Sequence, residues 1–257
     1  MKLIFCLLLF TSVSFAQTAA SVPSVQPADA HSNSAIKTPT PREIAHMEEM
    51  LQDWPDFARY RAANAALPAP APGENRVVFM GDSITDSWGH GDEFFPGKPY
   101  VNRGISGQTT PQMLVRFRAD VIDLKPKVVV ILAGTNDIAG NTGPSTPEMI
   151  EDNLTSMAEL GRVNGIRIVL SSILPAADYP WKPDIDPVDE ILLLNGWMQN
   201  YCARTGCVYL DYYSHLVNPE RGMKSNLTID GVHPNAAGYR VMDPLAEAAI
   251  AEALQPK

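Results

Sequence analysis

Two short blocks of the sequence carry the residue types needed for nucleophilic chemistry. Gly81-Asp82-Ser83 ends an apolar run, and Asp230-Gly231-Val232-His233 lies near the C-terminal end. A serine hydroxyl becomes an effective nucleophile only when a neighbouring base removes its proton. A neutral imidazole titrates close to neutral pH, so His233 is the candidate base, and Asp230 can orient its ring. The sequence therefore predicts a catalytic triad of Ser83, His233 and Asp230.

Two further blocks also follow apolar runs. These are Arg103-Gly104 and Gly134-Thr135-Asn136-Asp137. Asparagine side chains and glycine backbone groups can donate hydrogen bonds to an oxygen that gains negative charge during a reaction. All four blocks must meet in space for this chemistry, so the elements that carry them decide the interpretation.

Five apolar runs rich in β-branched residues predict strands. Their lack of polar alternation is typical of strands covered on both faces, as in parallel sheets. The predicted strands are 76–80, 100–102, 128–133, 166–171 and 208–212.

Helical patterns separate these strands. Thr146 is the expected N-cap of one helix, and Gly165 ends it. The alternation predicts an α/β fold, a three-layer α/β/α sandwich around a five-stranded parallel sheet of flavodoxin-like type. Ligands of such sheets bind beyond the carboxyl ends of the strands, so the four blocks should converge there. The predicted helices are 41–65, 110–124, 147–164, 188–204 and 235–254.

In these blocks the sequence resembles the SGNH hydrolases, also called the GDSL esterase/lipase family. The matching motifs occur in the family's order, and together with their intervals they cover nearly the whole predicted domain. The resemblance implies a serine carboxylic ester hydrolase whose triad is Ser83, Asp230 and His233. The motifs are GDSIT at 81–85, NRGISGQTT at 102–110, GTND at 134–137 and DGVHPN at 230–235.

The resemblance also implies an oxyanion hole formed by the backbone N–H groups of Ser83 and Gly104 and the side-chain amide of Asn136. Glycine at position 104 suits a backbone that must approach the reacting oxygen closely. Simpler roles exist for each residue. Ser83 can cap the following helix, Asn136 can cap a turn, and Asp82 and Asp137 are expected to be structural.

Neither a metal nor a cofactor is expected. Asp230 and His233 could instead be two zinc ligands, but no third ligand cluster is apparent in the sequence. The remaining histidines are scattered along the chain, at positions His31, His46, His90 and His215.

The N-terminus resembles a targeting segment. Lys2 precedes an apolar stretch, and small residues before Ala16 suit cleavage there, so we expect an exported protein, periplasmic or extracellular. The following stretch is rich in Ala, Ser, Pro and Thr and lacks apolar periodicity. The predicted organisation is a signal peptide (1–16), a flexible leader (17–42) and a hydrolase domain (43–257) that begins with a helical extension (43–75).

The net charge narrows the classes of possible binding partner, and the cysteines outside the predicted signal peptide allow one disulfide. A formal net charge of −9 argues against nucleic acids and anionic membrane surfaces, and no later run is long enough to span a bilayer. Outside the predicted signal peptide, Cys202 and Cys207 can either form a disulfide or remain free thiols. The sequence makes no prediction of oligomeric state.

The substrate is less well defined. Trp88, Tyr179, Trp181 and Tyr213 lie near the expected rim and either stack on a sugar or aryl group or pack loops. Without an apolar lid, a small ester or acylated carbohydrate is the favoured substrate, with O-acetyl groups on carbohydrate as the leading example. The alternatives are a lipid-directed lysophospholipase or thioesterase and, from another class, a non-catalytic carbohydrate-binding module. The last predicts a degraded set of catalytic residues, which this sequence does not show.

Overall fold

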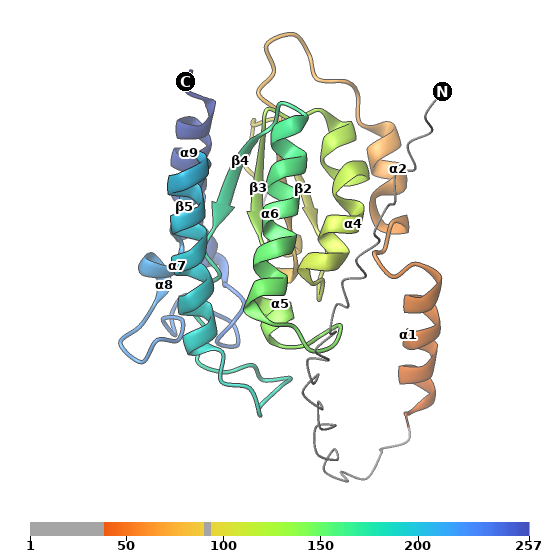
Figure 1. The fold of residues 1–257 in the computed structure, drawn as a ribbon, viewed down its shortest axis with the longest axis vertical. Helices are drawn as coiled ribbons and strands as arrows, with labels where there is room; N and C mark the ends of the chain where they lie inside the picture. Colours follow the sequence, from red (N-terminus) through yellow and green to blue (C-terminus); the bar gives the residue numbers. More distant parts are fainter. Residues whose placement is uncertain (1–38, 90–93, 257) are drawn as a thin grey trace, which may run out of the picture. The chain divides into compact units, whose positions relative to one another are not determined.

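The computed structural model describes residues 39–89 and 94–256, and these contain a parallel sheet with helices on both faces (Figure 1). The strand order is β2-β1-β3-β4-β5, and every pairing is parallel. The predicted three-layer fold with a five-stranded sheet is therefore confirmed. The strands are β1 (Val77–Gly81), β2 (Tyr100–Gly104), β3 (Val128–Leu132), β4 (Arg167–Ser171) and β5 (Val208–Leu210).

Helices follow the strands in the predicted order. Thr146 caps α6 as expected, because its side chain accepts a hydrogen bond from Met149 N. Three four-residue helices at strand ends or in loops were not predicted as separate elements. The helices are α1 (Pro41–Gln52), α2 (Ala58–Ala66), α3 (Ser83–Asp86), α4 (Thr110–Asp120), the 3₁₀ turn η1 (Ile122–Leu124), α5 (Thr135–Ile138), α6 (Pro147–Val163), α7 (Val188–Thr205), α8 (Tyr213–Leu216) and α9 (Ala236–Leu254).

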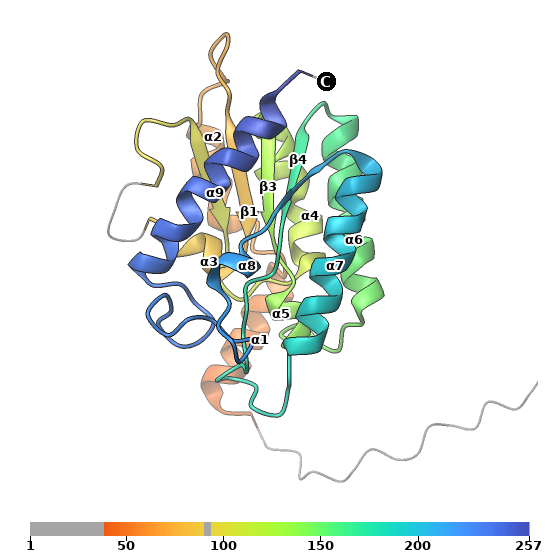
Figure 2. The same cartoon turned by 90° about the vertical axis from the view of Figure 1, so that its left-hand side faces the viewer.

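Two apolar cores lie on opposite faces of the sheet. Alternate strand residues such as Val78 and Val129 pack with buried residues of α4, α6 and α7. Their neighbours Val77 and Val128 pack with α9, which crosses the other face of the sheet (Figure 2). Because consecutive side chains of a strand point to opposite faces, an unbroken apolar strand supplies both cores.

The upstream segment forms two helices rather than the single periodic stretch 41–65. Asp53 lies between them, and its carboxylate accepts hydrogen bonds from Phe57 N and Ala58 N, at the start of the second helix, at 2.9 and 2.8 Å. Helix α1 begins at Pro41, two residues before the predicted start of the domain at residue 43. The predicted signal peptide and residues 17–38 of the predicted leader lie outside the described residues.

Cys202 and Cys207 form a disulfide, which settles the alternative that the sequence left open. The bridge joins the last turns of α7 to the residue before β5. Among the described residues, no helix is both long enough and apolar enough to cross a bilayer.

Candidate active site

The serine, histidine and aspartate predicted as a triad lie together at the carboxyl end of the sheet. Ser83 Oγ is 2.9 Å from His233 Nε2, although the two residues are 150 positions apart in the sequence. His233 Nδ1 is 2.7 Å from Asp230 Oδ2. With hydrogen on Nδ1, the ring donates to Asp230 and Nε2 accepts the hydroxyl hydrogen of Ser83, which is the arrangement needed to activate a serine.

A single turn of the chain holds the aspartate and the histidine. Asp230 Oδ1 accepts hydrogen bonds from Val232 N at 3.0 Å and from His233 N at 2.8 Å. Burial disfavours the charged form of Asp230, but these bonds and the bond to the His233 ring outweigh it and lower the pKa of the carboxyl. Asp230 therefore stays ionised and can stabilise a protonated imidazole.

Ser83 is presented by a tight junction between β1 and α3. A Cβ at Gly81 would lie 2.1 Å from Thr85 Oγ1 and 2.8 Å from Leu132 O, so only glycine allows this close packing. Asp82 Oδ1 accepts a hydrogen bond from Ile84 N at 3.0 Å and caps α3. The structural role predicted for Asp82 is thus confirmed.

Asp82 is fully buried, and burial raises its pKa to about 7. Its second oxygen, Oδ2, has no hydrogen-bond partner within the described part of the chain. A positive charge on His233 opposes this rise, because it favours the ionised carboxylate. A buried carboxyl with a pKa raised to about 7 therefore lies next to Ser83 in the chain.

The structure places Gly104 behind α3 rather than beside the reacting hydroxyl. Its N–H already donates to Asn102 Oδ1 at 2.8 Å, and its carbonyl accepts a hydrogen bond from Tyr60. A Cβ at this position would lie 2.1 Å from Asp86 N. Gly104 is therefore needed for the close approach of β2 to α3, which is a packing reason and not the catalytic reason expected from the sequence.

Asn136, by contrast, lies in a fixed orientation after β3. It is buried, its Nδ2 donates to Gln108 O at 3.1 Å, and its Oδ1 accepts from Asn141 Nδ2 at 2.8 Å. These bonds settle which end of the amide carries the hydrogens, and they leave the second hydrogen of Nδ2 for another acceptor. The same Asn141 amide donates to Gly107 O at 3.3 Å, so Gly107 is a neighbour of Asn136.

Gly107 differs from Gly104 in its conformation, its exposure and the use of its backbone N–H. Its φ of +79° lies in the region that favours glycine, and a Cβ there would meet open space. Its residue is exposed, and no hydrogen bond among the described residues uses its N–H. The sequence motif NRGISGQTT contains both glycines, and position alone could not distinguish them.

Asp137 ties the strand end to α4 instead of capping its own turn. Its carboxylate accepts hydrogen bonds from Thr110 N at 3.0 Å and from Thr110 Oγ1 at 2.5 Å. Burial raises the pKa of Asp137 to about 6, although the bonds from Thr110 oppose this. The expected structural role holds, but across two elements that are distant in sequence.

Of the four aromatic residues expected near the rim, Trp181 lines the site. Its side chain is 39% exposed, its ring centroid is 6.1 Å from that of His233, and Nε1 donates to Asn141 Oδ1 at 3.3 Å. Tyr179 is buried beneath it with the rings stacked at 5.1 Å. Trp88 is a core residue, and Tyr213 packs partly buried against the other core.

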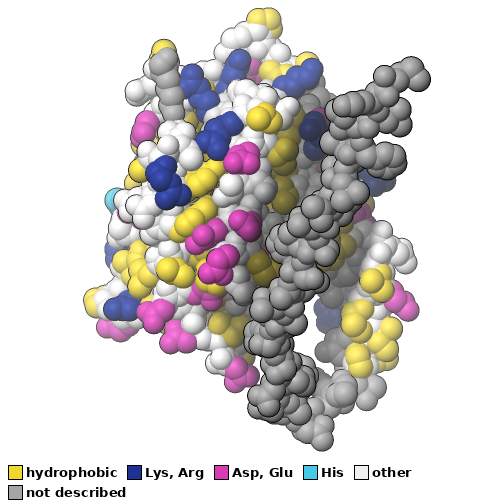
Figure 3. Space-filling view, in the orientation of Figure 1, with side chains coloured by type: hydrophobic (Ala, Val, Ile, Leu, Met, Phe, Trp, Pro, Cys, Tyr) yellow, Lys and Arg dark blue, Asp and Glu magenta, His cyan; other side chains and the backbone are white. Residues whose placement is uncertain are grey.

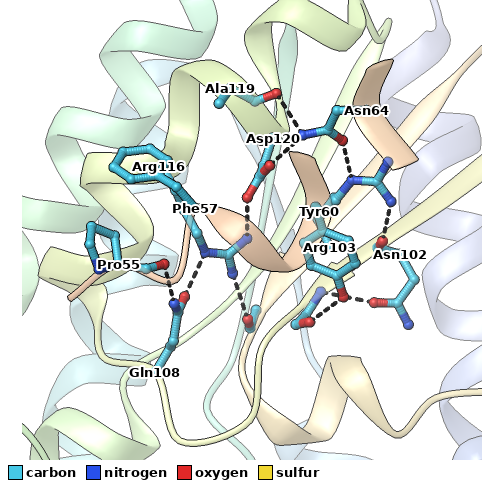
Figure 4. A network of polar contacts seen from close by, with 12 residues as sticks. Pro55, Phe57, Tyr60, Asn64, Asn102, Arg103, Gln108, Arg116, Ala119 and Asp120 are labelled. Atoms are coloured by element: carbon cyan, nitrogen blue, oxygen red, sulfur yellow. Dashed lines mark hydrogen bonds and ion pairs between the residues drawn. The ribbon is translucent and has the colours of Figure 1, made fainter. Parts of the chain in front are cut away.

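A buried polar network, absent from the sequence prediction, supports the site from behind (Figure 4). Arg116 is fully buried and donates to Gly81 O, to Gln108 Oε1 and to Asp120 Oδ2 at 3.1, 2.5 and 3.0 Å. Gln108 Nε2 in turn donates to Pro55 O at 2.7 Å. Arg116 thus joins the strand that precedes Ser83 to the loop in which Gln108 O accepts the hydrogen bond from Asn136.

A second part of this network attaches α2 to the sheet. Arg103 Nε donates to Asn64 Oδ1 at 2.8 Å, and Asn64 Nδ2 donates to Asp120 Oδ1 at 2.6 Å (Figure 4). The Arg103 guanidinium also lies 4.6 Å from the Tyr60 ring centroid. The helical extension is therefore bonded to the same network that supports the site.

The described residues contain no group of three or more histidine, cysteine or acidic side chains placed to hold a metal ion. Asp230 is bonded to His233 and to the backbone of its own turn. The two residues weighed as zinc ligands in the sequence thus bond to each other in the structure.

Comparison with known proteins assigns the family. Residues 79–241 match the GDSL-like Lipase/Acylhydrolase family, and the chain belongs to this family. The resemblance to SGNH hydrolases is thereby confirmed, and the expectation of a carboxylic ester hydrolase holds at the level of the family.

Individual relatives agree with this assignment. A solved GDSL-like lipase from Bacteroides thetaiotaomicron is 43% identical, with a TM-score of 0.76 over 79% of this chain and 100% of that one. The acetylxylan esterase of Xylanibacter ruminicola is 25% identical over 79% of this chain and 47% of its own length. Esterase TesA of Pseudomonas aeruginosa is 38% identical over 31% of this chain and 38% of its own. The chain thus spans less than half the length of these two curated relatives.

Proposed function

We propose that this protein is an exported serine esterase that removes short acyl groups, above all O-acetyl groups on carbohydrate, through an acyl-enzyme. The observation that carries the proposal is the continuous chain of contacts from Ser83 Oγ through the His233 ring to Asp230. Family membership supports the reaction class.

In the first step Ser83 Oγ attacks the ester carbonyl carbon, and its proton passes to His233 Nε2. Asp230 holds the ring through Nδ1 and stabilises the positive charge that the imidazole gains. The carbonyl oxygen becomes an oxyanion in the tetrahedral intermediate.

The oxyanion requires preorganised donors. Ser83 is the first residue of α3, where a backbone N–H lacks an acceptor within the helix, and Asn136 Nδ2 has a second hydrogen. As the third donor we propose the backbone N–H of Gly107 instead of that of Gly104, because the N–H of Gly104 is already bonded to Asn102 Oδ1. Loss of one such donor lowers turnover by about 10²–10³-fold.

The intermediate then collapses. His233 gives its proton to the leaving alcohol oxygen, and the acyl group remains on Ser83. A water molecule, deprotonated by the same imidazole, attacks the acyl carbon and releases the carboxylic acid. The serine recovers its proton and the cycle closes.

The surface around the site favours a neutral substrate. Acidic side chains gather at the end of the molecule where the strands end, on the face shown in Figure 3. Exposed carboxylates on the loop after β4 include Asp178, Asp184 and Asp186. These carboxylates repel anionic head groups but not a neutral glycan. Trp181 offers such a glycan a stacking surface. The similarity to an acetylxylan esterase supports the same substrate class.

One observation favours the lipid-directed alternative. A cavity of about 580 Å³ is lined in part by Pro234, the residue after His233, and by Phe94, Phe95, Ile229 and Tyr239. Such a cavity suits an acyl chain longer than acetyl. Asp243 and Glu247 also line it, which makes it a poor environment for a fully apolar tail.

Export is proposed on the N-terminal sequence: Lys2, the apolar stretch after it and the small residues before Ala16. Mass spectrometry of the protein recovered outside the cytoplasm should find a chain that begins near residue 17. A chain that retains Met1 there would contradict processing at this position.

Acyl release across a substrate series tests the function. We expect rapid acetate release from acetylated oligosaccharides and from nitrophenyl acetate, and slow release from long-chain lysophospholipids. Ser83→Ala should abolish both acetate reactions, while Ser156→Ala, at a serine whose hydroxyl donates to Asp152 O within α6, should leave them unchanged. Rapid lysophospholipid cleavage with no acetate release from glycans would favour the lipid-directed alternative, and full activity of Ser83→Ala would contradict the mechanism.

A further inference from the structure

A second cavity, of about 490 Å³, lies beside the oxyanion side of the site. Trp54 and Asp56 from the segment before α2 form one wall, and Gly107, Gln112 and Asn141 form the other. Asn141 is bonded to both Gly107 O and Asn136 Oδ1. The cavity therefore begins where the proposed oxyanion donors lie.

A continuous surface connects this cavity to the base. Trp181 contacts the His233 ring on one side and donates to Asn141 Oδ1 on the other. The leaving oxygen must lie near His233 Nε2, because that atom returns the proton. A leaving group longer than one ring can then extend along Trp181 and past Asn141 to Trp54.

The wall that carries Trp54 is fixed before any ligand binds. Gln112 Nε2 donates to Trp54 O at 2.6 Å, and Gln108 Nε2 donates to Pro55 O at 2.7 Å. Both glutamines are almost fully buried, at 4% and 3% exposure. The bonds hold the backbone while the Trp54 side chain remains 37% exposed, so a preorganised aromatic surface faces solvent.

The lining has the chemistry of a sugar site. An exposed indole stacks on the apolar face of a pyranose, and carboxylate, amide and hydroxyl groups bond its hydroxyls. Asp53 and Asp56 add negative charge, which disfavours anionic units. We propose that this cavity is a leaving-group subsite for a neutral acetylated oligosaccharide, with Trp54 as its stacking residue.

This inference rests on the proposed esterase function and names where its substrate binds. It assigns a substrate-binding role to a segment upstream of the residues that match the family, since Trp54 precedes residue 79. It also predicts that the contribution of Trp54 to kcat/KM increases with the length of the saccharide.

The test compares kcat/KM for nitrophenyl acetate, mono-acetylated xylose and acetylated xylo-oligosaccharides of increasing length. Trp54→Ala should lower kcat/KM about five- to tenfold for the longer oligosaccharides through KM, and leave nitrophenyl acetate within about twofold. Trp54→Phe should recover most of the loss. Leu192→Ala, at a residue of matched exposure on α7, is the control and should change neither.

A second variant tests the charge. Asp56 has a φ of +54°, which asparagine tolerates, so Asp56→Asn removes the charge without a backbone change. It should raise kcat/KM for acetylated oligosaccharides that carry uronic acids relative to kcat/KM for neutral ones.

The possible outcomes distinguish a failure of the proposed subsite from a failure of the proposed function. Wild-type cleavage of acetylated oligosaccharides that is unchanged in Trp54→Ala would overturn the subsite alone. Cleavage of nitrophenyl acetate with no cleavage of any acetylated saccharide would overturn both the carbohydrate assignment and the subsite, while the serine mechanism would stand. The subsite is supported by a loss in Trp54→Ala that increases with saccharide length.

Discussion

The site has two arms, one formed by Ser83, Asp82 and Asn136 and the other by His233 and Asp230, and the two are built in different ways. The arm that carries the proposed nucleophile, Ser83, is buried, with Asp82 at 0% and Asn136 at 4% exposure, and contacts from several distant elements hold it. The arm that carries the base is half exposed, with the His233 side chain at 26% and the Asp230 side chain at 38%. Hydrogen bonds within one turn hold much of it.

This difference separates stability from catalysis. Substitution in the buried arm leaves polar groups unpaired in the interior, so it should lower the free energy of unfolding. Substitution in the exposed turn removes few buried contacts, so it should affect the reaction more than the fold. The comparison can be broken by any variant that shows the opposite behaviour.

The largest effect is expected for Asp230→Asn. Asparagine keeps an oxygen for the N–H groups of Val232 and His233, but it no longer favours hydrogen on His233 Nδ1 or stabilises a protonated ring. We expect kcat for nitrophenyl acetate to fall about 10⁴-fold, as in a related triad, with little change in unfolding. Activity within tenfold of wild type would remove Asp230 from the triad, and a large loss of stability would break the comparison.

Arg116→Met should have the largest effect on the fold. It removes the partner of Asp120 in an ion pair whose side chains are 0% and 4% exposed, and leaves Gly81 O and Gln108 Oε1 without this donor. We expect the free energy of unfolding in urea to fall by about 3–5 kcal/mol.

Arg118→Met on the same helix is the matched control, because this arginine is exposed. It should change the free energy of unfolding by less than about 0.5 kcal/mol. Equal stability of the two variants would show that the buried network does not support the nucleophile arm.

A smaller, pH-dependent effect is expected for Asp82→Asn. Burial raises the pKa of Asp82 to about 7, whereas an unfolded aspartate titrates near about 3.9. Between these values the folded protein holds a proton that the unfolded chain has released. The contribution of Asp82 to stability is therefore complete at low pH and is lost as the pH rises through about 7.

Asparagine can still cap Ile84 N, and it does not titrate. The free energy of unfolding of wild type minus that of Asp82→Asn should therefore decrease from about pH 4 to about pH 7, by up to about 1.4 kcal/mol per pH unit. Urea unfolding of both proteins at several pH values measures this. A difference that stays constant, or increases, would contradict the raised pKa.

The sheet and the four blocks were predictable because both depend on local sequence. Runs such as 128–133 carry β-branched residues without polar alternation, which is typical of a strand buried on both faces. Parallel strands place their carboxyl ends at one edge, so Ser83 and Asn136 were expected at the same edge, and the structure places them after the paired strands β1 and β3. His233 does not follow a strand directly: it lies in the loop before α9, and its ring contacts Ser83 Oγ at that edge.

The support behind the site was not predictable, because it depends on long-range contacts. Arg116 lies one residue before the buried Phe117, and nothing in the helical pattern shows that a charged side chain is fully buried there. Gly104 and Gly107 lie three residues apart in one motif, and their roles are distinguished by the bond from Gly104 N to Asn102 and by the positive φ and open surroundings of Gly107. The break at Asp53 was hidden within a continuous helical period.

Covalent labelling of the active serine tests the central claim most directly. A fluorophosphonate reacts only with an activated serine, and peptide mapping by mass spectrometry locates the adduct. We predict one adduct, on Ser83, in the wild-type protein and little or none in His233→Ala, since Ser83 Oγ depends on the imidazole 2.9 Å away. An adduct on another serine, or equal labelling of Ser83 in His233→Ala, would contradict the account.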